Sequence, residues 1–309
     1  MAKHYEGIGK YASLFMQPSP TPPAPNAVRV TFMGVACLLF DDGEHSVLVD
    51  GFFTRPSRAA VILGKVEPDA ALIHQAIARA GMRHLDAVIV THSHYDHAMD
   101  SAEIAKQTGA VVVGSESTAN IARGAGLPPD KIRVMRDHSV ADFGAFHIQF
   151  IHSEHAPSAA MMIAGGDITK PLHVPTRAFH YQEGGTYSVL ITHGSQKMLV
   201  QSSAGFDEGA LKGQSADVIF LGVGLLGKQT DRYRDQFWNE VVRAVGAKRV
   251  IPVHWDDFMR PLNEPLVLAP RPFDEVESAI DFVIERAKAD KIDVRFLPTW
   301  TLTDPMQRL

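Results

Sequence analysis

The chain has 309 residues, of which 45% are hydrophobic, enough for one large α/β domain or two smaller ones with a substantial core. Its formal net charge of -5 argues against nucleic acid as a partner, because a polyanion normally requires a basic surface. No apolar run reaches the ~18 residues of a membrane span, so we expect no integral membrane segment.

Residues 1–27 are predicted to form a proline-rich N-terminal arm, because five prolines between positions 18 and 25 favour extended backbone. Tyr11, Leu14 and Phe15 could pack onto the domain or onto a second copy of the chain, which leaves a homo-oligomer open. The segment lacks the basic start and apolar centre of a secretory signal. We therefore expect a cytoplasmic protein, although a processed secreted form is not excluded.

Residues 28–309 are predicted to form one layered α/β domain of two similar βα halves, since strands and helices alternate twice along it. Segments 165–185 and 255–272 lack periodicity and should be loops over a cleft. Asp274 is the expected N-cap of the last helix. The predicted helices are 68–80, 101–107, 116–123, 232–245 and 274–288. The predicted strands are 28–32, 37–40, 46–49, 87–90, 110–113, 132–135, 139–143, 147–152, 161–164, 187–191, 197–201, 217–221, 249–253 and 294–297.

Four candidate metal ligands follow directly after the strand at 87–90. They are His92, His94, Asp96 and His97. Imidazole and carboxylate are the nitrogen and oxygen donors that zinc and neighbouring metals prefer. A tight turn at a strand end can aim several of them at one point, whereas a solvated loop rarely holds three histidines within six residues. The sequence therefore predicts a metal site here.

Two later strands also lead into histidines. The strand at 147–152 ends at His152 and is followed by His155, and the strand at 249–253 is followed by His254. Because strand ends meet at the edge of a sheet, these distant donors can join the first group. From the residues alone, either His152 or His155 could be the ligand.

This pattern resembles the metallo-β-lactamase-fold hydrolase superfamily, whose His-x-His-x-Asp-His signature is intact at residues 92–97. The segment leading into Gly184-Gly185-Thr186-Tyr187 looks more like the lactonase and phospholipase-D-like branch. The resemblance implies a four-layer αββα sandwich with the metal site at one edge of the sheets. It implies one or two zinc ions, with iron or manganese as alternatives, and a small-molecule substrate.

The resemblance also implies which residues hold each metal. His92, His94 and His155 correspond to one site, and Asp96, His97 and His254 correspond to a second. His155 is preferred over His152 because the turn Ala-Pro-Ser follows it, as it does after the family's third motif.

Ser203 is a departure from the family pattern. The family usually places there an aspartate that bridges both metals, within Gly-Asp-Thr-Gly, where this chain has Ser-Ser-Ala-Gly. A neutral hydroxyl lacks the charge and the second oxygen that two divalent ions share. A water-bridged pair of metals, a single metal and an inactive site are therefore all open, and Asp207 is an alternative carboxylate.

A zinc-like ion in this cluster would lower the pKa of bound water and polarise the scissile bond. We therefore expect a metal-dependent hydrolase of an ester, lactone or phosphodiester, in which Asp96 both holds metal and orients the water. A mononuclear iron oxygenase of a sulfur substrate and a non-catalytic metal-binding scaffold are the alternatives. Candidate substrate contacts, from the loops or beside the ligands, are His173, His180, Tyr187 and Trp255.

Overall fold

The computed structural model describes residues 8–19, 27–159, 161–271 and 273–307. Within these residues the strands form two sheets. The first, in spatial order, contains β1 (Arg29–Phe32), β2 (Leu38–Asp41), β3 (Ser46–Val49), β4 (Leu85–Ile89), β5 (Val111–Gly114) and β6 (Ile132–Val134). The second contains β13 (Asp293–Val294), β12 (Arg249–Val253), β11 (Val218–Gly222), β10 (Gln196–Gln201), β9 (Thr186–His193), β8 (Phe146–Ser153) and β7 (Val140–Phe143).

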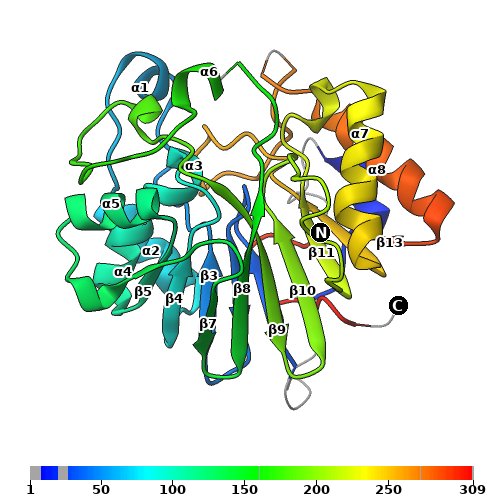
Figure 1. The fold of residues 1–309 in the computed structure, drawn as a ribbon, viewed down its shortest axis with the longest axis horizontal. Helices are drawn as coiled ribbons and strands as arrows, with labels where there is room; N and C mark the ends of the chain where they lie inside the picture. Colours follow the sequence, from blue (N-terminus) through cyan, green and yellow to red (C-terminus); the bar gives the residue numbers. More distant parts are fainter. Residues whose placement is uncertain (1–7, 20–26, 160, 272, 308–309) are drawn as a thin grey trace.

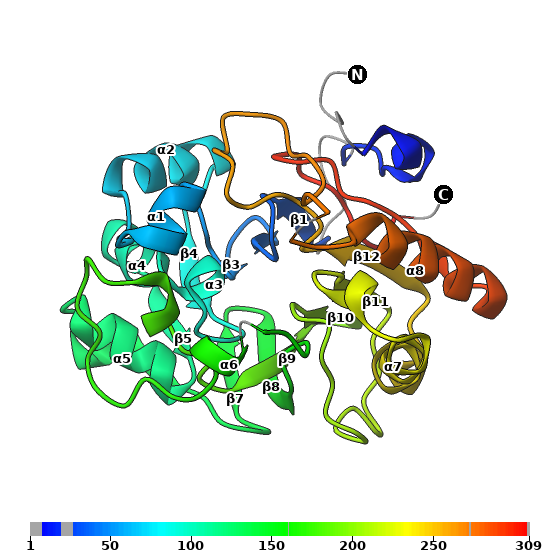
Figure 2. The same ribbon diagram turned by 90° about the horizontal axis from the view of Figure 1, so that it is seen from above.

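The helices lie outside the two sheets (Figure 1 and Figure 2). On the side of the first sheet are α1 (Arg58–Leu63), α2 (Ala70–Ala80), α3 (Tyr95–Ala98), α4 (Ser101–Thr108) and α5 (Glu116–Gly124). On the side of the second are α7 (Asp231–Phe237), which continues as a π-helix over Trp238–Arg243, and α8 (Val276–Asp290). The predicted αββα layering is confirmed.

One apolar core joins the sheets. Side chains of both sheets belong to a single buried cluster, in which the rings of Phe40 and Phe220 meet edge to face with centroids 5.3 Å apart. All five residues of β11 are buried, as expected for a parallel strand covered on both faces. The sheets are therefore held rigidly against each other, and their strand ends provide a stable base for a site.

Helix boundaries follow local capping for α2 but not for α8. Asp69 caps α2 by accepting hydrogen bonds from the amides of its first turn, and Gly81 ends it with φ at 67°. The prediction that Asp274 caps α8 is wrong, because the N-cap is Glu275. The Asp274 carboxylate instead accepts from the amides of Leu225 and Glu275, so it ties the helix start to a neighbouring loop.

The segment 161–164, predicted as a strand, forms the short helix α6 (Met161–Ala164). A four-residue apolar run does not distinguish a buried strand from a helix by periodicity. The side chain of Met162 is 88% exposed, so this run has no sheet to join. Short 3₁₀ turns lie at Pro129–Lys131, Ala178–His180 and Leu226–Lys228.

The described part of the N-terminal arm packs on the domain. Its 3₁₀ helix, Gly9–Leu14, brings Tyr11 and Phe15 onto the ring of Phe296, with centroids 5.8 and 5.4 Å apart. The backbones of Phe15 and Phe296 also form an isolated parallel β-bridge, just beyond the end of β13. Most of the predicted extended proline stretch, residues 20–26, lies outside the described residues.

No helix among the described segments combines the length and the apolar character that crossing a bilayer requires.

Candidate metal centre

Strand ends deliver the six predicted ligands to one place. The chain leaves β4 at Ile89, turns, and enters α3, which carries Asp96 and His97. His155 follows β8, and His254 follows β12 with a left-handed backbone (φ 58°). The amide of His254 donates a hydrogen bond to the carbonyl of Val35 at 2.6 Å.

The first triad consists of His92, His94 and His155, whose ligand atoms lie within 4.8 Å of one another. Their ring centroids are 4.8 to 5.1 Å apart. The second triad consists of Asp96, His97 and His254, with the same spacing limit. The triads adjoin, because the ring of His92 lies 3.9 Å from that of His97.

Hydrogen bonds outside the triads orient the rings. The Nδ1 atom of His97 donates to Oδ2 of Asp50 at 2.8 Å, and Nδ1 of His155 donates to the carbonyl of Ala156 at 2.9 Å. Because these acceptors cannot donate, Nδ1 of each ring keeps its proton, and Nε2 is the atom left to bind a metal once it is unprotonated. For His94 the roles reverse, since its Nε2 lies 3.2 Å from the carbonyl of Ala164 and leaves Nδ1 for the site.

Asp50 is the anchor of the second triad. Its carboxylate accepts from the amide of Thr91 at 2.8 Å and from the Thr91 hydroxyl at 2.6 Å, besides His97. Asp50 and His97 are both buried. Asp50 was not among the residues predicted for the site from the sequence.

Burial and the charges of neighbouring side chains shift the pKa values of the candidate ligands. Burial lowers the pKa of His94 to about 4, and that of His92 falls well below its usual value for the same reason. Burial opposes the charge on Asp96, yet the His97 and His254 rings hold its pKa well below the usual range. His97 is buried too, but the carboxylates of Asp96 and Asp50 raise its pKa to about 10.

One buried atom tests whether the site suits a metal. The described residues give Nε2 of His92 no hydrogen-bond partner, although the side chain is 1% exposed. An unpaired buried ring nitrogen costs free energy that a metal ion would recover by coordination. With two neutral imidazoles beside it and an anionic carboxylate next door, the donor set fits a divalent metal.

Ser203 and the two alternative ligands lie as follows. The hydroxyl of Ser203 accepts a hydrogen bond from the amide of Ala156 at 2.9 Å. Asp207 bonds His152 at 2.8 Å, and each of these side chains is about two-fifths exposed (43% and 44%). Neither belongs to a triad, whereas His155 does.

A cavity of about 470 Å³ opens over both triads. Ser202 and Ser203 line it together with all six donors. None of the four candidate substrate contacts lines this cavity. Their side chains are engaged elsewhere: Trp255 against Phe32 and Phe296, Tyr187 against Phe150, His173 on the Gly124 carbonyl, and His180 on the Thr176 hydroxyl.

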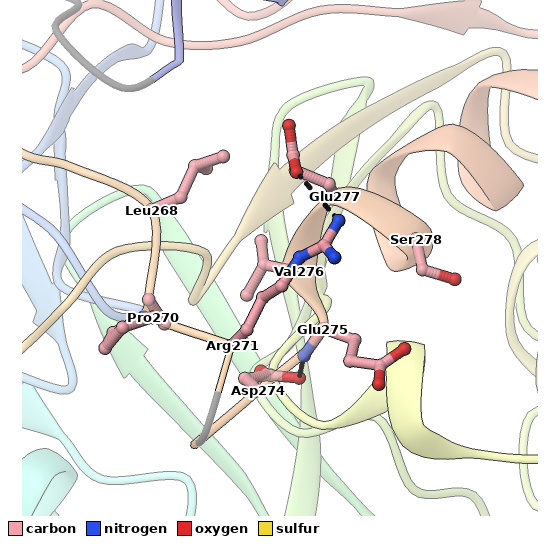
Figure 3. Close-up of a pocket in the computed structure, with 9 residues that line it drawn as sticks. Leu268, Pro270, Arg271, Asp274, Glu275, Val276, Glu277 and Ser278 are labelled. Atoms are coloured by element: carbon pink, nitrogen blue, oxygen red, sulfur yellow. Dashed lines mark hydrogen bonds and ion pairs between the residues drawn. The ribbon is translucent and has the colours of Figure 1, made fainter.

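A second cavity, of about 280 Å³, adjoins the first at the start of α8. Ala269, Pro270 and Asp274 line both. In Figure 3 the Arg271 side chain extends toward Glu277, and the two are 3.7 Å apart. This cavity holds none of the predicted ligands.

Most of the chain matches the model of a known protein family. The family model described as Metallo-beta-lactamase superfamily matches residues 30–207, a range that includes every predicted ligand except His254. A UPF0173 metal-dependent hydrolase from Methylobacterium nodulans is 31% identical over 148 residues, 48% of this chain and 55% of that protein. A UPF0173 metal-dependent hydrolase from Thermoplasma volcanium is 25% identical over 168 residues, which are 54% of this chain and 66% of that protein. The chain thus spans between half and two thirds of these relatives.

Solved structures share the fold. Igni18, a metallo hydrolase from Ignicoccus hospitalis, superposes with a TM-score of 0.56 at 14% identity, covering 88% of this chain and 96% of that one. CmlA, a diiron β-hydroxylase from Streptomyces venezuelae, gives 0.54 at 15% identity, covering 89% and 53%. At such identities the likeness concerns the fold alone.

Proposed function

Because this chain belongs to the metallo-β-lactamase superfamily, we propose that it is a metal-dependent hydrolase acting on an ester, lactone or phosphodiester of small size. The observation that carries the proposal is the convergence of the two triads at the floor of one cavity. The names of the relatives, metal-dependent hydrolases, support it.

His92, His94 and His155 would hold one metal ion, and Asp96, His97 and His254 would hold a second. Three nitrogen or oxygen donors with a position left open match catalytic zinc, so we propose zinc, in one or two ions. When bound, such an ion lowers the pKa of a coordinated water toward neutrality and polarises the scissile bond.

The chain itself contributes placement and a proton acceptor. Oδ2 of Asp96 lies 3.3 Å from Nε2 of His254 and 3.4 Å from Nε2 of His97, so the carboxylate is held among the donors. Its depressed pKa keeps it ionised at neutral pH, and an ionised carboxylate can orient a water molecule and take its proton. We assign Asp96 this catalytic role.

Ser203 supports a second candidate. A hydroxyl in place of a bridging carboxylate favours one metal over two, which suits a mononuclear iron oxygenase of a sulfur substrate. The fold likeness to an iron β-hydroxylase is compatible with this but selects no activity. A non-catalytic metal-binding scaffold is the third reading.

Metal analysis with a simple substrate separates these functions. We expect purified protein to hold at least one zinc per chain and to hydrolyse 4-nitrophenyl acetate until a chelator removes the metal. His94→Ala should lose both metal and activity. His152→Ala should keep both, because the imidazole that it removes lies outside the triads. Iron with oxygen uptake would indicate the oxygenase, and full metal without turnover the scaffold. Metal-free protein that still hydrolyses the ester would refute the proposal.

A further inference from the structure

The mouth of the cavity over the triads is built of apolar side chains from separate segments. Helices α1 and α6 stand at the same end of the molecule as α3 (Figure 1). The 3₁₀ turn at Ala178–His180 and the loop before α8 complete the wall. Among the large apolar side chains that line it are Ile62, Ile163, Phe179, Phe258, Met259 and Phe273.

These side chains are exposed to an extent that packing does not explain. Ile62 is 57% exposed and Ile163 is 65% exposed, and both point onto the cavity. Their helix neighbours Leu63 and Met162 are still more exposed. Of the ten exposed large hydrophobic residues that the structure describes, four line this cavity: Ile62, Ile163, Phe179 and Phe273. Such clustering beside a concave site indicates a ligand that covers it.

The cavity offers no positive side chain to a charged ligand. Among the described residues that line it, none is lysine or arginine. Of the guanidinium groups near it, Arg55 pairs with Asp256, Arg58 pairs with Asp257 and Arg271 faces Glu277, the last visible in Figure 3. The guanidinium of Arg177 lies over the ring of Phe179, 5.9 Å from its centroid. A phosphate or carboxylate away from the metals would therefore find no cation among the lining residues, which makes its desolvation costly.

We propose, resting on the hydrolase function above, that the substrate is an uncharged carboxylic ester or lactone with an apolar chain. The scissile carbonyl lies over the triads and the chain lies along Ile62, Ile163 and Phe273. Water forms a bond to the carbonyl carbon, the ester C–O bond breaks, and the displaced alcohol oxygen takes a proton that came from the water. A phosphodiester is disfavoured, because it carries a negative charge, and a non-bridging oxygen that is not held at the triads would face an apolar wall.

Chain length in a series of esters tests the proposal. For the wild-type protein we expect kcat/KM to rise at least about tenfold from 4-nitrophenyl acetate to the octanoate, since each buried methylene favours binding. The double variant Ile62→Gln, Ile163→Gln should reduce this ratio at least about fivefold. Leu302→Gln is the matched control, because Leu302 is 41% exposed and does not line the cavity, and it should keep the wild-type ratio.

Binding provides a readout that does not need turnover. The uncharged fluorophore N-phenyl-1-naphthylamine should bind the wild-type and Leu302→Gln proteins, be displaced by octan-1-ol, and bind the double variant at least about fivefold more weakly.

Three outcomes would overturn the substrate assignment. The first is an equal kcat/KM for the acetate and the octanoate. The second is a drop of the octanoate-to-acetate ratio in Leu302→Gln as large as in the double variant. The third is faster turnover of bis(4-nitrophenyl) phosphate than of the octanoate. If instead no ester is hydrolysed in a metal-dependent way, the hydrolase function fails. The fluorophore result then still decides whether the mouth takes an apolar ligand. Probe binding accompanied by dimerisation on a sizing column would assign the apolar mouth to a second copy and refute the proposal.

Discussion

The guanidinium of Arg55 and the carboxylate of Asp256 form an ion pair of 2.8 Å in which both side chains are fully buried. The pair joins two segments that are 201 residues apart, and Asp256 is one of the residues that line the cavity. Asp256 also accepts from the amide of Val35 at 2.7 Å. Because the carbonyl of Val35 receives the amide of His254, the pair supports the turn that presents this proposed ligand.

We predict that Arg55→Met destabilises the protein by about 3–5 kcal/mol, because it leaves the Asp256 carboxylate buried without a partner. Urea unfolding measures the change. Adding Asp256→Asn should recover a large part of the loss, since the amide oxygen can still accept from Val35. Arg260→Met, which breaks an exposed pair with Glu264, should cost less than about 1 kcal/mol. Similar losses in both single variants would contradict the role of burial.

We predict that Asp50→Asn weakens metal binding by about 10–100-fold, because an amide holds the His97 ring less firmly than a carboxylate. Asparagine tolerates the positive φ of 46° at this position, so the backbone should survive. Competition with a chromogenic chelator measures the affinity. Asp42→Asn is the control, since Asp42 makes a similar carboxylate–imidazole bond of 2.9 Å with His193 outside both triads. An unchanged affinity in Asp50→Asn would refute the orienting role.

We predict that Ser203→Asp raises the metal content per chain, because it adds the charge and the second oxygen that two ions can share. The wild-type protein should show weaker occupancy of its second site in elemental analysis. Ser203→Asn has nearly the size of aspartate without its charge and should not raise occupancy. Full occupancy of both sites in the wild-type protein would remove the reason for the prediction.

We predict an acid-sensitive stability for the protein after metal removal. Burial, together with the nearby His155, lowers the pKa of His94 to about 4. An unfolded histidine has a pKa of about 6.5, so the unfolded chain binds more protons between these values. The contribution of neutral His94 to the free energy of unfolding is therefore present above pH 6.5 and is lost as the pH falls toward 4. His97, whose pKa is raised, adds little to this slope because it is largely protonated in both states there.

Urea unfolding between pH 6.5 and 4 measures this effect in chelator-treated protein. The free energy of unfolding should fall by up to about 3 kcal/mol more in the wild-type protein than in His94→Gln. Equal slopes in the two proteins would contradict the assignment to His94.

The ligand cluster and the layered fold could be predicted from local patterns. Residues 92–97 directly follow a strand, and the segments carrying His155 and His254 do the same. Because a sheet gathers the ends of its strands at one edge, this local information was sufficient to expect donors more than 150 residues apart in one cluster. The division of that cluster into two triads came from the resemblance to the superfamily. The alternation of strand and helix patterns similarly indicated the layers, since each pattern must bury its apolar face.

Which side chains face the cavity was decided only by the tertiary structure. Trp255 follows a proposed ligand in sequence, yet its ring fills the core between Phe32 and Phe296. Ile62 carried no signal in the sequence and stands at the cavity mouth. Helix α6 was predicted as a strand because a run of four apolar residues fits either state, and only the folded chain shows that no described strand pairs with it. The pairs Arg55–Asp256 and Asp50–His97 depend on contacts between distant segments, and a carboxylate in a loop does not reveal its partner until the chain has folded.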